Sequence, residues 1–374
     1  MKIIFFANTE WYLYNFRLGL ARYLRDKGYE VIMMSPMGPY GEKLVQEGFR
    51  WYGLPMDRMS INIFTEMKLL WKIWKIYRSE KPDVVHNFTI KCVVYGSLMG
   101  RFAGVHSRIN AVTGLGHVFI GGSLKASLLR PIVKLLLKMT LAGKQSRLIL
   151  QNPDDKALFL KLGLVDENKI DLIKGSGVNT DLFLPVDHSV KKPFKVFLAA
   201  RLLWEKGIRE YIEVIKFLHE KRPGEFEFYL VGSSDSGNPS AVPQDDIDQW
   251  IREDLVIAPG HVDDIHTMMK EMDLVVLPSY REGVPRGLIE AAAMELPIIT
   301  TDAPGCREIV ADGVNGYLVP VRDWKVMANK MEYLLDNTDI CEQLGKAGRQ
   351  KVLDEFDEKI VFEKTFHVYE KVLG

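Results

Sequence analysis

Residues 274–293 read LVVLPSYREGVPRGLIEAAA, and this stretch decides the fold. The apolar run Leu274–Leu277 predicts a buried parallel strand, and the small apolar residues that follow Pro285 predict a helix. Proline suits a first helical position, where its missing N–H costs nothing and the free amides around it face any anion placed there. A strand, a glycine–proline loop and a helix in this order indicate an open α/β sheet, whose ligands bind at the carboxyl ends of the strands.

Two carboxylates lie eight residues apart on this stretch. Glu282 is in the loop, and Glu290 is about two turns into the helix. Both side chains can therefore reach hydroxyl groups of one bound ligand. Carboxylates accept hydrogen bonds from hydroxyls, whereas they repel a phosphate. The pair predicts a ligand that carries hydroxyl groups at both of its ends.

A cationic loop lies upstream of the paired carboxylates. The apolar run Phe194–Ala200 predicts another strand, and Arg201 and Lys206 follow it. The guanidinium fork of arginine and the point charge of lysine are the usual pair for neutralising a diphosphate. Neither motif is specific alone, but together they predict a ligand with a diphosphate between two hydroxyl-bearing groups. That description fits a sugar nucleotide.

Strands alternate with helices along the whole chain. The predicted strands span 2–6, 30–34, 50–54, 83–86, 107–112, 147–151, 171–174, 195–200, 226–231, 255–258, 273–277, 297–300 and 316–319. Most are one helix length apart, which predicts two doubly wound parallel sheets of the α/β class. The polar segment Pro185–Pro193 reads as a linker. We therefore predict an N-terminal domain over 1–187 and a C-terminal domain over 188–355.

The composition allows two ordinary hydrophobic cores, because 47% of the 374 residues are hydrophobic. The three cysteines are scattered and odd in number, which argues for a reducing compartment. The first apolar run, Met1–Phe6, is too short for a signal peptide, and no stretch is apolar for long enough to span a membrane. We therefore expect a cytoplasmic location.

The zero net charge hides an asymmetry between the two halves of the chain. Residues 1–187 contain 26 Lys and Arg against 16 Asp and Glu, whereas the remainder contains 23 against 33. Residues 84–153 hold nine basic residues and no acidic one. Such a basic half is suited to an anionic membrane surface and a lipid-diphosphate acceptor. The basic stretch lacks a recognised nucleic-acid motif, so nucleic acid is not expected as a partner.

Two helices combine apolar and basic residues. In the helix predicted over 124–139, the basic side chains fall on one face among leucines, as in a helix that lies in a membrane interface. The predicted membrane-binding residues are Lys125, Arg130, Lys134 and Lys138. The helix over 68–78 is similar and carries aromatic residues, but it leads directly into the strand at Asp83. We predict that this second helix covers the sheet.

Further motifs carry a resemblance to a known family. Residues 175–183 read GSGVNTDLF and residues 305–310 read GCREIV. With the two ligand motifs, they make the chain resemble glycosyltransferase family 4. The resemblance implies retaining transfer and the GT-B fold, in which two Rossmann-like, doubly wound parallel-sheet domains face a central cleft. It also implies that a C-terminal helix over 356–374 crosses back to the N-terminal domain.

The resemblance assigns roles on the donor side. Arg201 and Lys206 would stabilise charge on the diphosphate, and Glu282 would position the transferred sugar. The donor-binding set is Gly283, Val284, Pro285 and Glu290, with Glu290 on the ribose. The family often places a histidine just after the fifth strand, near the transferred sugar. His117 is the nearest candidate for this catalytic position, and His86 is the competing choice.

The acceptor should bind to the N-terminal domain. Arg17 follows the first strand and Lys91 the fourth, so both would lie at the carboxyl edge of the sheet, where they could bind the acceptor's diphosphate. Arg286, beside the donor loop, could meet a sugar substituent, although an arginine in the first turn of a helix is expected to face solvent.

No metal or other cofactor is expected. Asp246 and Asp248 have the spacing of a metal-binding motif, but they fall in an exposed amphipathic helix predicted over 244–253, away from any strand end. Arg201 and Lys206 already provide two positive charges where a divalent ion would act.

The narrower resemblance concerns the acceptor. YNFR at 14–17 and VTGLG at 112–116 resemble bacterial enzymes that extend undecaprenyl-diphosphate-linked sugars, such as the N-acetylgalactosaminyltransferases of protein-glycan, capsule and O-antigen pathways. We therefore expect transfer of a hexose or N-acetylhexosamine from a UDP-sugar, for example UDP-GalNAc, to a polyprenyl-diphosphate-linked saccharide at the inner face of the cell membrane. The alternatives are a sugar-nucleotide epimerase of the same architecture and a transferase with a soluble acceptor; the donor base is uracil or guanine.

Overall fold

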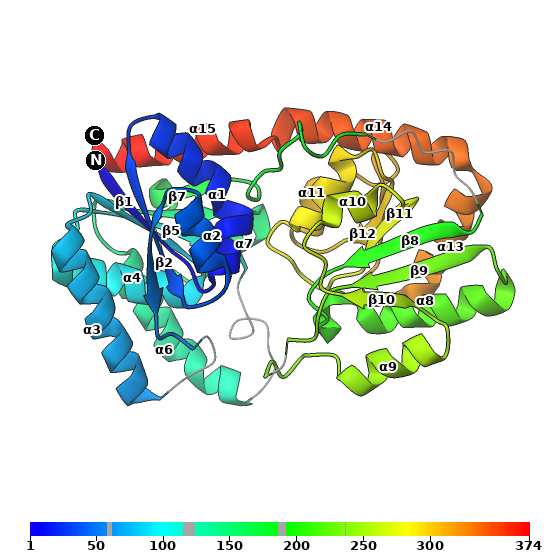
Figure 1. Ribbon diagram of the computed structural model, residues 1–374, viewed down its shortest axis with the longest axis horizontal. Coiled ribbons are helices and arrows are strands. Elements are labelled where there is room, and N and C mark those ends of the chain that lie inside the picture. The colour runs from blue at the N-terminus through cyan, green and yellow to red at the C-terminus, as the bar shows by residue number, and fades with distance from the viewer. Residues whose placement is uncertain (58–61, 115–123, 186–191, 236) are drawn as a thin grey trace. The chain divides into compact units, whose positions relative to one another are not determined.

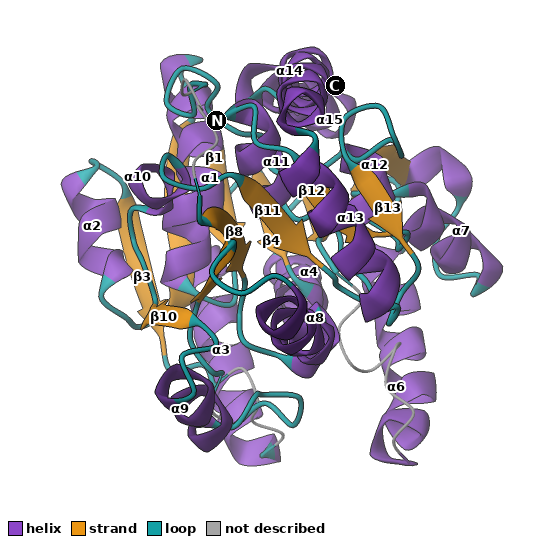
Figure 2. Ribbon diagram, turned by 90° about the vertical axis from the view of Figure 1, so that its right-hand side faces the viewer, coloured by secondary structure: helices purple, strands orange, loops and turns teal. Residues whose placement is uncertain are grey.

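The computed structural model describes residues 1–57, 62–114, 124–185, 192–235 and 237–374 (Figure 1). These residues form two compact units: unit 1 comprises Met1–Ser176 and Lys359–Gly374, and unit 2 comprises Gly177–Glu358. Each unit is a parallel sheet with helices on both faces, as the strand pattern predicts (Figure 2). Every predicted strand is present, and the strand ends differ from the prediction by a few residues.

The sheet of unit 1 has seven parallel strands in the order β3-β2-β1-β4-β5-β6-β7. They are β1 (Lys2–Phe6), β2 (Glu30–Pro36), β3 (Arg50–Leu54), β4 (Val84–Phe88), β5 (Ser107–Val112), β6 (Ser146–Leu150) and β7 (Ile170–Leu172). Successive residues of a strand face opposite sides of the sheet, and Phe5 and Phe6 are both fully buried. Helices must therefore cover both faces.

The described helices of unit 1 are α1 (Glu10–Asp26), α2 (Tyr40–Gln46), α3 (Ile63–Glu80), α4 (Ile90–Ala103), α6 (Leu124–Leu141), α7 (Pro153–Lys161), the short helix η1 (Glu167–Lys169) and α15 (Glu358–Leu373). Helices α1 and α15 bury Leu24 and Tyr369 in one core with the sheet. Helices α3 and α4 bury Ile73 and Met99 against the other face. The C-terminal helix is thus part of the core of unit 1.

The sheet of unit 2 has six parallel strands in the order β10-β9-β8-β11-β12-β13. They are β8 (Phe194–Ala199), β9 (Phe226–Val231), β10 (Ile257–Gly260), β11 (Leu274–Leu277), β12 (Ile298–Thr301) and β13 (Tyr317–Val319). The helices are η2 (Trp204–Lys206), α8 (Ile208–Lys221), α9 (Gln244–Arg252), α10 (Ile265–Met269), α11 (Arg286–Ala293), α12 (Cys306–Ile309), α13 (Trp324–Asp336) and α14 (Thr338–Glu355). One core contains Ile215 and Met331 from α8 and α13, and the other contains Ile289 and Val352 from α11 and α14.

The division between the units falls after Ser176, earlier than the predicted boundary between 187 and 188. The N–H of Val178 donates to the Phe356 carbonyl at 3.0 Å, and the N–H of Glu358 donates to the Val178 carbonyl at 2.9 Å. Phe183 and Phe356 also lie in one core of unit 2. These contacts attach the segment that begins at Gly177 to unit 2.

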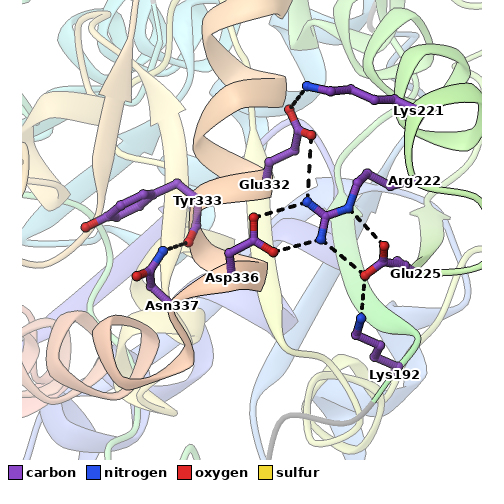
Figure 3. Close-up of polar contacts among 8 residues, drawn as sticks. All are labelled: Lys192, Lys221, Arg222, Glu225, Glu332, Tyr333, Asp336 and Asn337. Atoms are coloured by element: carbon purple, nitrogen blue, oxygen red, sulfur yellow. Dashed lines mark hydrogen bonds and ion pairs between the residues drawn. The ribbon is translucent and has the colours of Figure 1, made fainter.

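An ion-pair cluster ties the end of α8 to α13 (Figure 3). Arg222 donates to the two carboxylate oxygens of Asp336 at 3.1 and 2.7 Å and to Glu225 at 2.9 Å. Lys221 pairs with Glu332 at 2.9 Å. Hydrogen bonds from Arg222 and then Lys192 lower the pKa of Glu225 to about 2. The cluster therefore stays charged at neutral pH and holds the outer helices of unit 2 together.

Candidate functional site

Two loops of unit 2 meet at one edge of its sheet. β8 and β11 are neighbours, with Val196 opposite Leu274, so the loops that leave their carboxyl ends emerge side by side. Gly207 has a φ of +76°, and a Cβ at this position would lie 2.1 Å from the Pro278 carbonyl oxygen. Only glycine allows the two loops to approach this closely.

The contact between the loops brings Lys206 and Glu282 together. The Lys206 ammonium forms an ion pair with Glu282 Oε1, and the Ser279 hydroxyl donates to the same oxygen at 2.6 Å. The two charged side chains are only 15% and 13% exposed. The structure thus pairs two residues that were predicted to bind different parts of one ligand, the diphosphate and the sugar.

A third loop holds the backbone of Glu282 in place. The N–H of Glu282 donates to the Pro304 carbonyl at 3.0 Å. Gly305 has a φ of +83°, and a Cβ there would lie 2.3 Å from the Gly283 carbonyl oxygen. A larger residue at Gly305 would push the loop 282–283 away from the sheet. The GCREIV motif therefore has a physical reason, which the sequence alone did not reveal.

Glu290 lies in α11, directly behind the same loop. It is buried, and its Oε1 accepts a hydrogen bond from Arg286 Nε at 2.7 Å. Burial raises the pKa of the Glu290 carboxyl, and the charge of Arg286 opposes this rise. The expectation that Arg286 faces solvent is wrong, because its guanidinium reaches one turn along α11, towards the C-terminal end of the helix, to pair with this carboxylate.

Arg201 has a different partner from Lys206. Its Nη1 donates to Asp235 Oδ2 at 3.0 Å, and its side chain is 59% exposed. Asp235 was not predicted, and no sequence signal marks it. Asp246 and Asp248 lie on α9, which buries Ile247 and Trp250 against unit 2 as an amphipathic helix. Within the described residues, no group of three or more His, Cys, Asp and Glu side chains could hold a metal ion.

The two predicted acceptor residues differ in their surroundings. Arg17 is buried at 6% exposure, donates to the Tyr12 hydroxyl at 2.6 Å and places its guanidinium over the Phe88 ring at 4.5 Å. It lines a small cavity in unit 1. Lys91 donates to the Asp57 carbonyl at 2.7 Å and to Glu66 at 2.9 Å, so its charge is already paired within unit 1.

Of the two histidine candidates for the catalytic position, only His86 lies within the described residues. His117 lies outside the described residues. His86 is in β4, where its Nδ1 shares a hydrogen bond of 2.6 Å with the Tyr369 hydroxyl and its ring lies 4.1 Å from that of Phe88. Burial, and then the charge of Arg17, lower the pKa of His86 well below its usual value. His86 is therefore a neutral core residue that lines the same small cavity as Arg17.

The predicted membrane-binding helix is α6. The side chains of Lys125 and Arg130 lie outside the described part of the chain. Lys138 is exposed and Lys134 is half-buried, while Leu137 and Leu141 pack in the core. No helix among the described residues is both long and apolar enough to cross a membrane.

Two doubly wound parallel-sheet units of this kind make up the GT-B class of glycosyltransferases, and solved structures share this fold. An Anabaena protein, HepE, in complex with UDP and glucose matches with a TM-score of 0.80 at 18% identity and covers 99% of both chains. A sucrose-phosphate synthase from Thermosynechococcus elongatus matches with a TM-score of 0.78 at 19% identity, over 100% of this chain and 99% of the other. At these identities the likeness concerns the fold.

Family models and curated relatives agree with this class. Residues 2–152 match the model "Glycosyl transferase 4-like", and residues 183–351 match "Glycosyl transferases group 1". The chain belongs to the glycosyltransferases that combine these two domains, and it is an enzyme of that kind.

Two relatives match over most of their length. The N,N'-diacetylbacillosaminyl-diphospho-undecaprenol alpha-1,3-N-acetylgalactosaminyltransferase of Campylobacter jejuni is 28% identical over 100% of this chain and 99% of its own. The capsular polysaccharide biosynthesis glycosyltransferase CapM of Staphylococcus aureus is 25% identical over 95% of this chain and 93% of its own.

Proposed function

We propose that this enzyme moves a hexose or N-acetylhexosamine, with retention of configuration, from a UDP-sugar to a lipid-diphosphate-linked saccharide in bacterial glycan assembly. The assignment of the donor site rests on the Lys206–Glu282 ion pair and on Glu290, which lies behind the same loop. The acceptor class is supported by the name of the Campylobacter jejuni relative, which specifies a diphospho-undecaprenol-linked sugar. The bound UDP and glucose of the Anabaena structure support the donor class by analogy of fold.

The ion pair can exchange partners when the donor binds. A diphosphate at Lys206 replaces Glu282 as the counter-ion, and the released carboxylate accepts hydrogen bonds from the transferred sugar. Glu290 accepts from the ribose hydroxyls, and the amides around Gly283 to Pro285 face the phosphates. Arg201 is free to leave its exposed pair with Asp235 and to join Lys206, because surface ion pairs contribute little stability.

Transfer then needs no base from the protein. The bond between the sugar C1 and the diphosphate oxygen breaks, and a new bond forms from C1 to the acceptor hydroxyl oxygen on the same face. The acceptor's proton moves to the departing phosphate oxygen. Lys206 and Arg201 stabilise the negative charge that develops on this leaving group, so neither a metal nor another cofactor is required.

Arg17 is the better of the two acceptor candidates in unit 1. Its buried guanidinium has no carboxylate partner among the described residues, whereas Lys91 is paired with Glu66. A buried, unneutralised arginine attracts an anion more strongly than an exposed one. We therefore assign the acceptor's diphosphate to Arg17, and we assign the anionic membrane surface to the four basic residues of α6.

A product analysis separates this proposal from an epimerase. Purified protein is incubated with a panel of UDP- and GDP-sugars, with and without short polyprenyl-diphosphate-linked saccharides, and the products are resolved by chromatography and mass. The proposal predicts that the acceptor gains one hexose or N-acetylhexosamine and that the nucleoside diphosphate is released only when acceptor is present. Conversion of the sugar nucleotide into an isomer without any acceptor would show an epimerase instead.

A further inference from the structure

Helix α3 exposes large apolar side chains along its first half. Ile63, Phe64, Met67 and Trp71 are 75%, 82%, 61% and 61% exposed. The opposite side of the helix buries Leu69, Ile73, Ile76 and Tyr77 against the sheet. The prediction that this helix covers the sheet is therefore confirmed for its buried side. It does not account for the large apolar side chains on the exposed side. Large apolar patches of this kind on a protein surface usually mark a site of interaction.

The exposed side of α3 is also basic. At about 100° per residue, the apolar and basic exposed side chains fall within one arc of the helix. This exposed arc consists of Ile63, Phe64, Met67, Lys68, Trp71, Lys75 and Arg78. Lys75 lies over the Trp71 ring with its Nζ 5.4 Å from the ring centre.

The two acidic residues of α3 lie away from this arc. Glu66 pairs with Lys91 at 2.9 Å, and Glu80 pairs with Arg50 and with Lys2. The exposed arc therefore combines apolar and basic side chains without a carboxylate. Apolar and aromatic residues with flanking lysines are the composition of helices that lie in a membrane interface. Lysine is depleted at protein–protein interfaces, so the two lysines of the arc favour a lipid surface over a protein partner.

A second exposed apolar group lies on neighbouring helices. Helices α3 and α6 project from the same side of unit 1, and α4 packs between them (Figures 1 and 2). Phe102 at the end of α4 is 69% exposed, and Leu135 of α6 is 60% exposed. The Trp74 indole donates to the Phe102 carbonyl at 3.4 Å, which fixes α3 against α4.

We infer that the exposed arc of α3 docks on an anionic lipid bilayer, with Phe64, Met67 and Trp71 in the interface and Lys68, Lys75 and Arg78 on the lipid head groups. Each charged contact acts over a distance of about one Debye length from the surface. The inference deepens the proposed function, because it brings unit 1 to the membrane in which a lipid-linked acceptor lies.

Vesicle binding by the full chain tests this surface. Co-sedimentation is measured with phosphatidylcholine vesicles and with vesicles that also contain about one-third phosphatidylglycerol. The apolar variant is Phe64→Ser with Trp71→Ser, and the basic variant is Lys68→Gln with Lys75→Gln and Arg78→Gln. We expect the apolar variant to lose about tenfold or more in affinity for the anionic vesicles and the basic variant to lose its preference for them.

Control variants remove the same number of exposed apolar or basic side chains from unit 2. Val314→Ser with Leu184→Ser removes exposed apolar side chains, and Lys216→Gln with Lys270→Gln and Lys325→Gln removes the same charge. Both controls should bind vesicles within about twofold of the wild type. In addition, brominated lipids should quench the tryptophan emission of the wild type more than that of Trp71→Phe. This variant keeps the apolar surface, so the difference in quenching reports how deeply Trp71 enters the bilayer.

Two results would overturn the inference. One is unchanged vesicle binding by the apolar variant when its thermal unfolding matches that of the wild type. The other is a wild-type dimer that the apolar variant converts to a monomer, without vesicle binding by either, which would make the arc an interface between two copies. Transfer to a short-chain, water-soluble acceptor should be equal in all variants, so loss of all transfer would count against the proposed function and not against this surface.

Discussion

Lys206 and Glu282 neutralise each other in the free protein, and both were assigned to the donor. Their pairing keeps two largely buried charges compensated, and we propose that a diphosphate takes the place of the carboxylate when the donor binds. Ser279 holds Glu282 Oε1 at 2.6 Å, so the carboxylate keeps a partner when the lysine leaves.

Removal of either charge should therefore abolish most transfer. We expect Lys206→Ala and Glu282→Ala each to reduce kcat by about a hundredfold or more, because one electrostatic contact to the reacting groups is lost. Steady-state transfer assays measure this, with Lys325→Ala as a control on an exposed lysine of unit 2. Near-normal turnover in either folded variant would remove that residue from the site.

Arg286 acts through Glu290. Burial raises the pKa of the Glu290 carboxyl, and Arg286 opposes this rise, so without Arg286 the carboxyl takes up a proton at a higher pH. A neutral carboxyl is a poorer acceptor for ribose hydroxyls. We expect Arg286→Leu to raise the KM for the donor about tenfold, which corresponds to a loss of roughly 1.4 kcal/mol in donor binding. The rise in KM should be larger at about pH 6 than at about pH 8, because more of the Glu290 carboxyl is protonated at the lower pH.

The pH dependence distinguishes this positioning role from a packing role. Arg286→Lys keeps a charge near Glu290 and should recover much of the donor affinity. If Arg286→Leu changed the KM equally at both pH values, Arg286 would contribute only to packing.

The sequence points to the charged candidate site residues, but it does not predict the partners that they have in the structure. Glu282, Glu290 and Lys206 stand at recognisable positions of strand–loop–helix units, so their chemistry could be inferred locally. The pairing of Lys206 with Glu282 depends on which strands are neighbours, and the contact of Gly207 with Pro278 makes it possible. These relations join residues more than seventy positions apart and leave no local pattern.

At the scale of elements, the C-terminal end of α3 is held by an ion-pair cluster. Glu80 accepts hydrogen bonds from Tyr52 at 2.5 Å, from Lys2 at 2.9 Å and from Arg50. Burial alone would raise the pKa of Glu80, but these hydrogen bonds outweigh it and lower the pKa to about 2. They join the helix to β1 and β3 and so hold the element that carries the exposed arc.

This lowered pKa makes the cluster sensitive to acid. An unfolded glutamate has a pKa of about 4.3, so the contribution of Glu80 to the free energy of unfolding is complete above that pH and is lost as the pH falls towards 2. We expect Glu80→Gln to lower the thermal unfolding midpoint at neutral pH and to flatten its fall between about pH 5 and pH 3. Calorimetry across this range measures both effects.

Glu342→Gln is the matched control, because Glu342 forms an exposed pair with Lys346 on α14. Its replacement should leave the midpoint nearly unchanged. An unfolding profile of Glu80→Gln that coincides with the wild type at every pH would show that the cluster does not stabilise unit 1.

The strands were easier to predict than the faces of the helices. A parallel strand buried on both sides is a continuous apolar run, as in Leu274–Leu277, so its position follows from composition alone. Helix α3 has apolar side chains on two sides, and periodicity does not tell which side meets the sheet. The structure settles this by burying Ile73 and exposing Trp71.

For the molecule as a whole, the candidate functional residues are divided between the two units. Unit 2 carries the predicted donor residues, and unit 1 carries Arg17 and the exposed arc of α3. The predicted boundary relied on the prolines and the polarity of the segment Pro185–Pro193. The division between the two compact units depends on the pairing of Val178 with the chain near Phe356. A contact between residues so far apart in the sequence cannot be predicted from a local sequence pattern.

We expect the whole enzyme to work without a divalent ion. If Lys206 and Arg201 supply the positive charge at the diphosphate, as we propose, transfer should persist in excess EDTA. Asp246→Asn with Asp248→Asn should leave the rate nearly unchanged, since both residues belong to an amphipathic helix. Loss of activity in EDTA that manganese or magnesium restores would contradict this assignment.

A crystal structure of the full chain with UDP would show directly whether the loops after β8 and β11 form the donor site. We expect Lys206 Nζ to leave Glu282 and to lie within hydrogen-bonding distance of a diphosphate oxygen, while the Glu290 carboxylate accepts hydrogen bonds from the ribose hydroxyls. UDP bound elsewhere, with the Lys206–Glu282 pair intact, would contradict this expectation.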